Sequence, residues 1–165
     1  MHKGLNKELE KNFSNIRFTD RPLIETTKIS DPNWISGFSS GESCFDVKII
    51  ESIRYTVGYT VQIRFRITQH IRDIALLALI LSYLNCGTLQ FSRNTVDFSV
   101  TNYKDIINII IPYFNKYPIL GIKNKDFEDF CKVAKLMQGK AHLTEEGIIQ
   151  IRQIKAEMNK GRLMQ

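Results

Sequence analysis

Apolar residues recur at every second position in residues 44–54 and again in residues 59–68. In the first stretch Phe45, Val47 and Ile49 point one way, and in the second Val61 and Phe65 do the same. A period of two predicts strands with one buried face, because successive side chains of a strand point to opposite sides. We expect these two strands to form a hairpin that turns near Gly58.

The same alternation predicts a second hairpin over residues 88–101, with its turn at Arg93-Asn94. Two apolar residues precede this turn and three follow it, separated by threonine, serine, glutamine and aspartate. The side chains expected to face inward are Leu89, Phe91, Val96, Phe98 and Val100.

Asp31-Pro32 predicts the start of a helix that runs to Gly41, because aspartate caps a helix and proline suits its first position. This helix has an unusual face of small residues. They are Ser36, Gly37, Ser40 and Gly41. Glycine inside a helix costs about 1 kcal/mol relative to alanine. We therefore expect another backbone to approach this face closely and to recover that cost.

Helical spacing or continuous apolar sequence predicts the remaining elements. Residues 72–85 are nearly apolar all round and predict a buried helix; residues 104–113, 126–138 and 145–158 predict three more, the last capped by Thr144. Residues 1–30 predict a short helix, from Leu5, Leu9 and Phe13, and a linker-like segment. Residues 31–165 then form a single domain.

The order of elements is helix, two strands, helix, two strands and helices, which predicts an α+β fold. Two hairpins make a four-stranded antiparallel sheet with helices on its apolar face. The other face carries Arg, Lys and Gln among Thr and Ser, and these side chains hydrogen-bond base edges and phosphates. Polar outward residues are also what any sheet with one solvated face shows.

Composition supports one globular domain with a polyanionic partner. The 165 residues are 43% apolar and 24% charged, and Lys and Arg exceed Asp and Glu by 23 to 17, for a net charge of +6. This excess favours nucleic acid over a membrane surface. The longest apolar run, residues 74–84, is about half of the roughly 20 residues that a spanning helix needs. Cys44, Cys86 and Cys131 form no CxxC pair, which favours a reducing, intracellular compartment.

Residues 34–45 read WISGFSSGESCF and resemble the signature of the LAGLIDADG homing endonucleases. In that family a helix of small residues ends in Gly-Asp or Gly-Glu and runs directly into the first DNA-binding strand. The resemblance continues through ITQH at 67–70, GIK at 121–123, DFEDFCK at 126–132 and HLT at 142–144. It is greatest to the C-terminal half of fungal mitochondrial members with two motifs, and implies a mitochondrial, intron-encoded protein. Ser39, Ser40 and Ser43 depart from the usual residues.

Only one motif is found, whereas an active member needs two. The resemblance therefore implies a homodimer, or a chain that is half of a longer enzyme. We expect two copies of the helix to pack through Trp34, Ser36, Gly37, Ser40 and Gly41. The two Glu42 carboxylates would then lie close together, and like charges so near each other favour divalent cations between them. Oxygen ligands, including the Gly41 carbonyl, select Mg²⁺, for which Ca²⁺ or Mn²⁺ can substitute.

The resemblance also implies roles for two further residues. Gln62 would orient the attacking water, and Lys123, in a loop after the third helix, would neutralise charge on the phosphate in the transition state. Each half would cut one strand of a long pseudo-palindromic double-stranded DNA site and leave 3′ overhangs. The expected DNA contacts are Cys44, Asp46, Lys48, Ile50, Ser52, Arg54, Thr60, Gln62, Arg64, Arg66, Thr68, Thr88, Gln90, Ser92, Arg93, Thr95, Asp97, Ser99 and Thr101.

Two other functions stay open on the sequence. A maturase-like protein could use the same sheet to bind intron RNA without cleaving DNA. The basic face could also be incidental to a structural α/β protein. Binding that weakens steeply with salt would argue against the latter, because neutralised phosphates release counterions.

Overall fold

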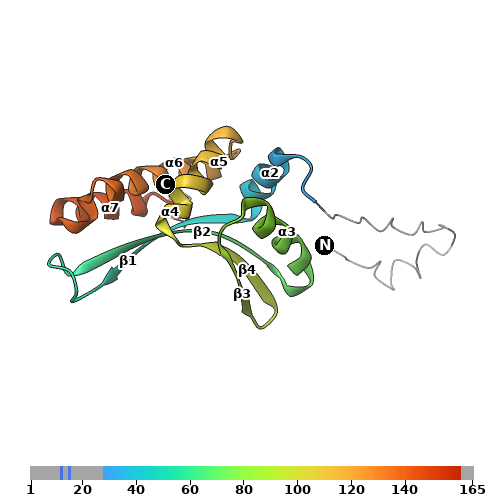
Figure 1. Cartoon of the computed structure of the whole chain (residues 1–165), viewed down its shortest axis with the longest axis horizontal. Helices are drawn as coiled ribbons and strands as arrows, with labels where there is room; N and C mark the ends of the chain where they lie inside the picture. The colour runs from blue at the N-terminus through green and yellow to red at the C-terminus, as the bar shows by residue number, and fades with distance from the viewer. Residues whose placement is uncertain (1–11, 13–14, 16–27, 161–165) are drawn as a thin grey trace.

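A computed structural model describes residues 28–160 together with Asn12 and Asn15. Its centre is an antiparallel sheet of four strands in the order β1-β2-β4-β3. The strands are β1 (Ser43–Glu51), β2 (Tyr59–His70), β3 (Thr88–Ser92) and β4 (Thr95–Val100). Helices cover one side of the sheet and leave the other side open (Figure 1). The predicted α+β class and the arrangement of its sheet are confirmed.

The helices also follow the predicted order. They are α2 (Pro32–Glu42), the 3-10 turn η1 (Ile71–Asp73), α3 (Ile74–Leu84), α4 (Tyr103–Asp105), the π-helical η2 (Ile106–Ile110), α5 (Ile111–Lys116), α6 (Lys123–Gln138), the 3-10 turn η3 (Ala141–Leu143) and α7 (Glu145–Ala156). Both predicted caps form: Asp31 accepts from the Asn33 amide and Thr144 from the Gly147 amide. The helix predicted within residues 1–30 lies outside the described residues.

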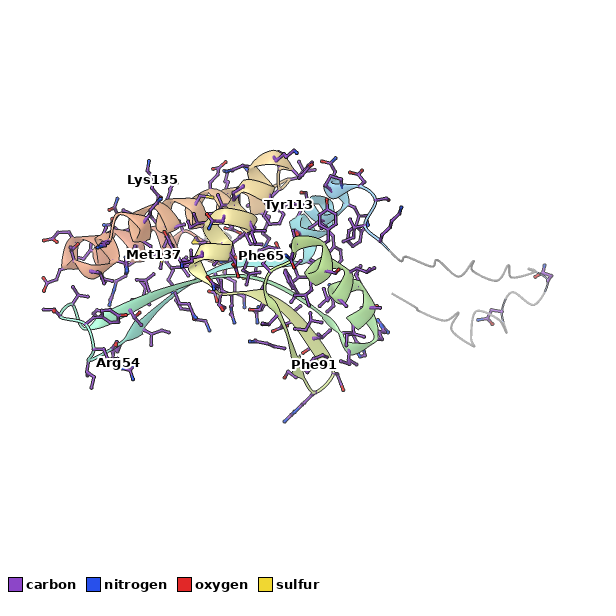
Figure 2. All side chains as sticks on the ribbon, viewed as in Figure 1. Arg54, Phe65, Phe91, Tyr113, Lys135 and Met137 are labelled. Carbon is purple, nitrogen blue, oxygen red and sulfur yellow. The ribbon has the colours of Figure 1, made fainter. Side chains whose placement is uncertain are left out.

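The predicted alternation of the strands places their apolar residues against the helices. Phe45 of β1 pairs with Phe65 of β2, and their ring centroids lie 5.1 Å apart. Phe114 of α5 and Phe130 of α6 cover them, at 5.2 Å from Phe65 and 5.3 Å from Phe45. Tilted and edge-on rings at such distances are favourable arrangements. This aromatic cluster is the centre of the core, and Figure 2 labels one of its members, Phe65.

Three predictions about burial or strand length were wrong. Helix α3 buries only Leu77, Ile80 and Leu84, because the rest of its apolar surface faces away from the sheet. Phe91 is 61% exposed near the tip of the β3–β4 hairpin, beyond the reach of the helices (Figure 2). Strand β1 ends at Glu51 rather than at residue 54, so the chain turns earlier than the pattern indicated.

The helix predicted over residues 104–113 is longer and contains a π turn. The amide of Ile111 donates to the carbonyl of Ile106, five residues earlier, before Pro112 follows in α5. Ile106, Ile110 and Phe114 are all buried against the sheet. Across the described part of the chain, no helix is both long and apolar enough to cross a lipid bilayer.

We predict that Gly147→Ala strongly destabilises the fold, because a Cβ at this buried position would collide with the backbone of Ala141. A backbone clash cannot be relieved by a change of rotamer, so we expect a loss of about 2 kcal/mol or more. The matched control is Gly139→Ala after α6, where φ is -76° and a Cβ would lie 3.8 Å from the Leu136 and Lys135 carbonyl oxygens, an ordinary contact. That change should be neutral or stabilise by up to about 1 kcal/mol. Urea unfolding of the two variants measures both effects, and equal stabilities would contradict the prediction.

Candidate functional site

Helix α2 and strand β1 meet without an intervening loop. The backbone amide and the hydroxyl of Ser43 both donate to the carbonyl of Ser39, the hydroxyl at 2.6 Å, and the Ser43 side chain is buried. Glu42 is the last residue of α2 and is exposed. The junction therefore presents a carboxylate at the negative end of a helix dipole, which favours a nearby positive charge.

Gln69 of β2 contacts this carboxylate directly. Its Nε2 donates to Oε2 of Glu42 at 3.0 Å. The strand register explains the contact, because Ser43 pairs with Ile67 and Gln69 lies two residues further along β2. Gln69 lies in the ITQH segment that resembles the family, but that resemblance predicts no role for it, since it does not show which side chain reaches the helix.

Gln62 lies elsewhere on the sheet. It pairs with Lys48, five residues along β2 from the Ile67–Ser43 pair. At about 3.3 Å per residue this separation is about 17 Å. The structure does not bring Gln62 to Glu42, and this distance removes the geometric basis for its expected role beside the attacking water. Gln62 remains exposed on the polar face of the sheet.

Lys123 begins helix α6 rather than lying in the preceding loop, which corrects the predicted boundary. The segment before it is bound to α2: the hydroxyl of Ser36 donates to the carbonyl of Tyr117 at 2.6 Å, and the Leu120 amide donates to the hydroxyl of Ser40 at 2.9 Å. These bonds bring the start of α6 to the Glu42 end of the sheet. In agreement, Lys123 lies near enough to Cys44, two residues after Glu42, for its positive charge to act to lower the pKa of that thiol, against the larger effect of burial.

The face of small residues on α2 is narrower than predicted. Ser36 is buried and, with Ser40, is bonded to residues 117–120, so these two hydroxyls serve the chain's own packing. Gly37 and Gly41 are exposed, and a Cβ at either would meet nothing within 4 Å. Trp34 is 42% exposed and stacks on Phe38. It also lines a cleft of about 380 Å³ with Leu76 and Leu79 of α3. The two glycines and Trp34 are therefore the positions of this predicted interface that are open to a partner.

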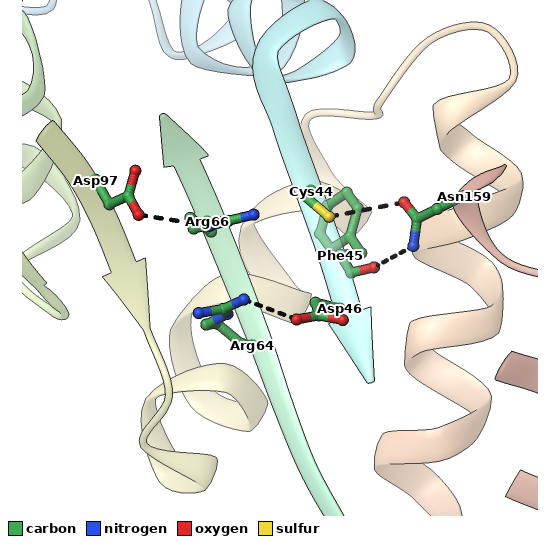
Figure 3. A network of polar contacts seen from close by, with 7 residues as sticks. All are labelled: Cys44, Phe45, Asp46, Arg64, Arg66, Asp97 and Asn159. Carbon is green, nitrogen blue, oxygen red and sulfur yellow. Dashed lines mark hydrogen bonds and ion pairs between the residues drawn. The ribbon is translucent and has the colours of Figure 1, made fainter. Parts of the chain in front are cut away.

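Residues after α7 hold the start of β1 in place. Asn159 donates through Nδ2 to the carbonyl of Phe45 at 3.0 Å (Figure 3). Its backbone amide donates to Oδ1 of Asp126 in α6 at 2.9 Å. Its Oδ1 accepts from the Cys44 thiol at 3.7 Å. One asparagine thus connects the strand that follows Glu42 with the helix that begins at Lys123.

The polar face of the sheet carries two ion pairs (Figure 3). Nη2 of Arg64 lies 2.8 Å from Oδ2 of Asp46, and Nη1 of Arg66 lies 3.5 Å from Oδ2 of Asp97. Each pair joins neighbouring strands, the first from β2 to β1 and the second from β2 to β4. Arg64 and Arg66, two of the four arginines expected to contact DNA, are therefore partly buried and already paired with carboxylates.

The other predicted DNA contacts have differing exposure. Ser99 points to the polar face but is only 2% exposed, because its strand neighbours cover it, so the contact expected of it is not available in this structure. Ser52 and Arg54 lie in the turn after β1, and Thr101 follows β4. The exposed members of the predicted set are Ile50, Arg54, Gln62, Thr68, Thr88, Gln90, Ser92, Arg93 and Thr101.

One copy of this chain supplies few ligands for a metal ion. Among residues 28–160 no group of three His, Cys, Asp or Glu side chains is placed to hold one. Glu42 and the carbonyl of Gly41 offer oxygen donors at an exposed position, and such donors suit a hard divalent cation. These donors fit part of a coordination shell, and the remaining ligands would have to come from outside the described chain.

Known proteins resemble this chain over most of its length. The model of the LAGLIDADG endonuclease family matches residues 35–134. Probable intron-encoded endonuclease 3 of Neurospora crassa is 41% identical over 151 residues, which are 90% of this chain and 28% of that protein. Probable intron-encoded endonuclease 2 of the same fungus is 37% identical over 164 residues, or 92% of this chain and 35% of that protein. This chain thus spans about a third of the length of these curated relatives.

Solved structures agree with the fold over almost the whole chain. The crystal structure of the homing endonuclease I-SmaMI bound to cleaved DNA superposes with a TM-score of 0.88 at 42% identity, over 98% of this chain and 55% of that one. The structure of I-LtrWI bound to its target DNA gives a TM-score of 0.86 at 42% identity, over 98% and 54%. Both solved chains are nearly twice the length of this one.

We predict that none of the three cysteines is a reactive thiolate at neutral pH. Burial raises the pKa of Cys131 and of Cys86 to about 11, and burial followed by the Asp46 charge raises the pKa of Cys44. A raised pKa keeps the thiol protonated, so alkylation of Cys131 by iodoacetamide in the folded protein should increase up to about pH 11. In the unfolded chain it should level off above about pH 8.5. Mass spectrometry of labelled peptides measures both profiles, and coincident profiles would contradict the assignment.

Proposed function

Because this chain belongs to the LAGLIDADG endonuclease family, we propose that it acts as one catalytic unit of a site-specific double-stranded DNA endonuclease. The observation that carries this proposal is the position of Glu42. Its exposed carboxylate lies where α2 joins the polar sheet, with Gln69 bonded to it and Lys123 at the same end of β1. The I-SmaMI structure with cleaved DNA supports the activity, because that protein shares this fold at 42% identity.

The open face of the sheet is the proposed DNA-binding surface. Lys48, Arg54 and Arg93 carry positive charge on its strands and turns, and none of them forms an ion pair with a described residue. These cations suit phosphate contacts, which contribute affinity and set the register. Strand β1 has nine residues and spans about 30 Å, close to the length of nine base pairs.

We further propose that Glu42 and the Gly41 carbonyl contribute ligands to a divalent cation, with Mg²⁺ as the physiological ion. When bound, such an ion activates water and stabilises the leaving oxygen in phosphodiester hydrolysis. The calcium present with uncleaved DNA in a structure of I-SmaMI supports a metal-dependent reaction. In this chain Gln69 holds the Glu42 carboxylate in place, and Lys123 brings positive charge toward the phosphate.

A single unit would cut one strand, so the proposal includes a second copy of this chain. We propose that two copies pack α2 against α2 through Gly37 and Gly41, flanked by Trp34, and so form a homodimer. Glycine lets two backbones approach closely, and the exposure of both positions supports this use. The dimer would bind a pseudo-palindromic site, because its two-fold symmetry is matched by the DNA, and would leave 3′ overhangs.

The proposed setting of this activity is an organelle. Two of the relatives are named as intron-encoded endonucleases of Neurospora crassa, and a third, 32% identical, is named from an intron of ND4 in Podospora anserina. We propose that this chain is likewise encoded in an intron and acts in the mitochondrion.

We predict that Glu42→Gln abolishes DNA cleavage and leaves DNA binding intact. The change removes the ligand charge but keeps the side-chain shape, so we expect cleavage to fall by about a hundredfold or more, a loss typical of one charge-stabilising group. The assay incubates the protein with a randomised duplex library and Mg²⁺ and sequences the cut ends. Glu146→Gln, at an exposed position of α7, is the control with the same change in charge.

Each outcome of that assay is informative. Cleavage that persists in the Glu42 variant would contradict the mechanism while keeping the class of enzyme. An unaltered chain that binds intron RNA and cuts no duplex would instead support the maturase-like function.

We predict that Gly37→Leu prevents self-association and leaves each protomer folded. A leucine at this open position of α2 would hold a second helix away, and its Cβ would meet no described atom of its own chain within 4 Å. Sedimentation equilibrium with and without DNA measures the assembly, and circular dichroism checks the fold. Gln150→Leu, on the exposed side of α7, is the matched control. Dimers that survive in the Gly37 variant would show that the interface lies elsewhere.

A further inference from the structure

The two ion pairs on the open face have an unusual position for residues that meet DNA. Arg64 and Arg66 are neighbours on the same face of β2, and their carboxylate partners lie on opposite sides of them, Asp46 on β1 and Asp97 on β4. The four side chains are 18–34% exposed. Two like charges are thus kept side by side on the central strand, each neutralised by a carboxylate from a different neighbouring strand.

The contacts also limit how each guanidinium can turn. Asp46 accepts from Nη2 of Arg64, and the Nε of Arg64 is buried without a partner among the described residues. Asp97 accepts from Nη1 of Arg66, whose Nε is likewise buried and unpartnered in this part of the chain. Each carboxylate accepts from one Nη atom, and the Arg64 and Arg66 side chains stay 18% and 34% exposed, so the remaining Nη–H donors of each planar group are available for a bidentate contact from the open face.

From this arrangement we infer that Asp46 and Asp97 are specificity-determining positioning residues, which hold Arg64 and Arg66 for contact with base edges. The inference rests on the proposed DNA-binding function. An arginine held by a carboxylate loses rotational freedom before binding, and its remaining donors keep a fixed direction. A fixed guanidinium discriminates guanine, which presents two acceptors in the major groove, from the other bases.

Phosphate binding alone would not require this arrangement. A carboxylate beside an arginine repels phosphate and lowers affinity for DNA of any sequence, so the pairs act against unspecific binding. Specificity commonly uses such a repulsive element together with an attractive one. The cations Lys48, Arg54 and Arg93, which have no carboxylate partner among residues 28–160, differ from the two paired arginines in this respect.

The test compares the unaltered chain with Asp46→Asn, Asp97→Asn and the double variant. Each protein is incubated with a randomised duplex library without divalent cations, and the bound fraction is sequenced to obtain base preferences. Affinity for a random duplex is measured in parallel against salt. Glu146→Gln, on the helix side of the molecule, is the control for a change of one charge.

We expect the double variant to lose about five- to tenfold of its discrimination at the positions with the strongest base preference, the range expected for one bidentate arginine contact. Its affinity for random duplex should rise, because two repulsive charges are removed from the binding face. Asp46→Glu keeps the negative charge, so it should retain more of the base preference than Asp46→Asn does. The control should leave the base preferences unchanged.

The outcomes separate this inference from the function on which it rests. Base preferences that stay unchanged in a folded double variant, or that weaken equally in the control, would overturn the positioning role alone. No sequence-dependent binding by the unaltered chain would overturn both the role and the proposed function. If the double variant unfolds in a thermal scan, Asp46→Asn decides the matter, because it removes only one of the two pairs and keeps the shape of the side chain.

Discussion

The direct junction of α2 with β1 is the constraint on which the rest of the site depends. A helix that passes into a strand at Ser43 cannot rotate relative to the sheet, since the Ser43 amide and hydroxyl are both bonded to the Ser39 carbonyl and the side chain is buried. The position of Glu42 above the sheet, the reach of Gln69 and the outward direction of the α2 glycines all follow from that geometry. A flexible loop at this point would separate the acidic end from the DNA face.

The charged groups of the open face divide into two kinds. Arg64 and Arg66 are held by carboxylates on neighbouring strands, whereas Arg54 and Arg93 lie in the turns and have no such partner in the described part of the chain. The paired arginines have restricted side-chain motion and a charge that is partly neutralised. The unpaired arginines attract any polyanion. Behind this face, Asn159 connects β1 with α6, so the start of β1 is supported from the side opposite β2.

Much of the fold follows from periodicity, and less of the site does. Alternation predicted the four strands and the buried faces of Phe45 and Phe65, because burial on one side of a sheet imposes a period of two. Sequence pattern was less informative for α3, since a helix that is apolar all round does not show how many of its faces are buried. Gln69 reaches Glu42 because of the register between β1 and β2, which has no local signal in the sequence. Lys123 begins α6 without a capping side chain, so its place in a helix has no local signal either.

The π turn before Pro112 determines which side chains of this helical segment face the sheet. Ile106, Ile110 and Phe114 are buried at intervals of four residues. In a regular α-helix of 3.6 residues per turn, eight residues overshoot two turns by about 80°, which would swing Phe114 away from the aromatic cluster. The wider turn at Ile106–Ile110 absorbs that overshoot. The π turn thus sets the rotation of α5 relative to the sheet. Removing one residue from it would rotate the buried face of α5 away from the sheet and displace the segment that leads to Lys123.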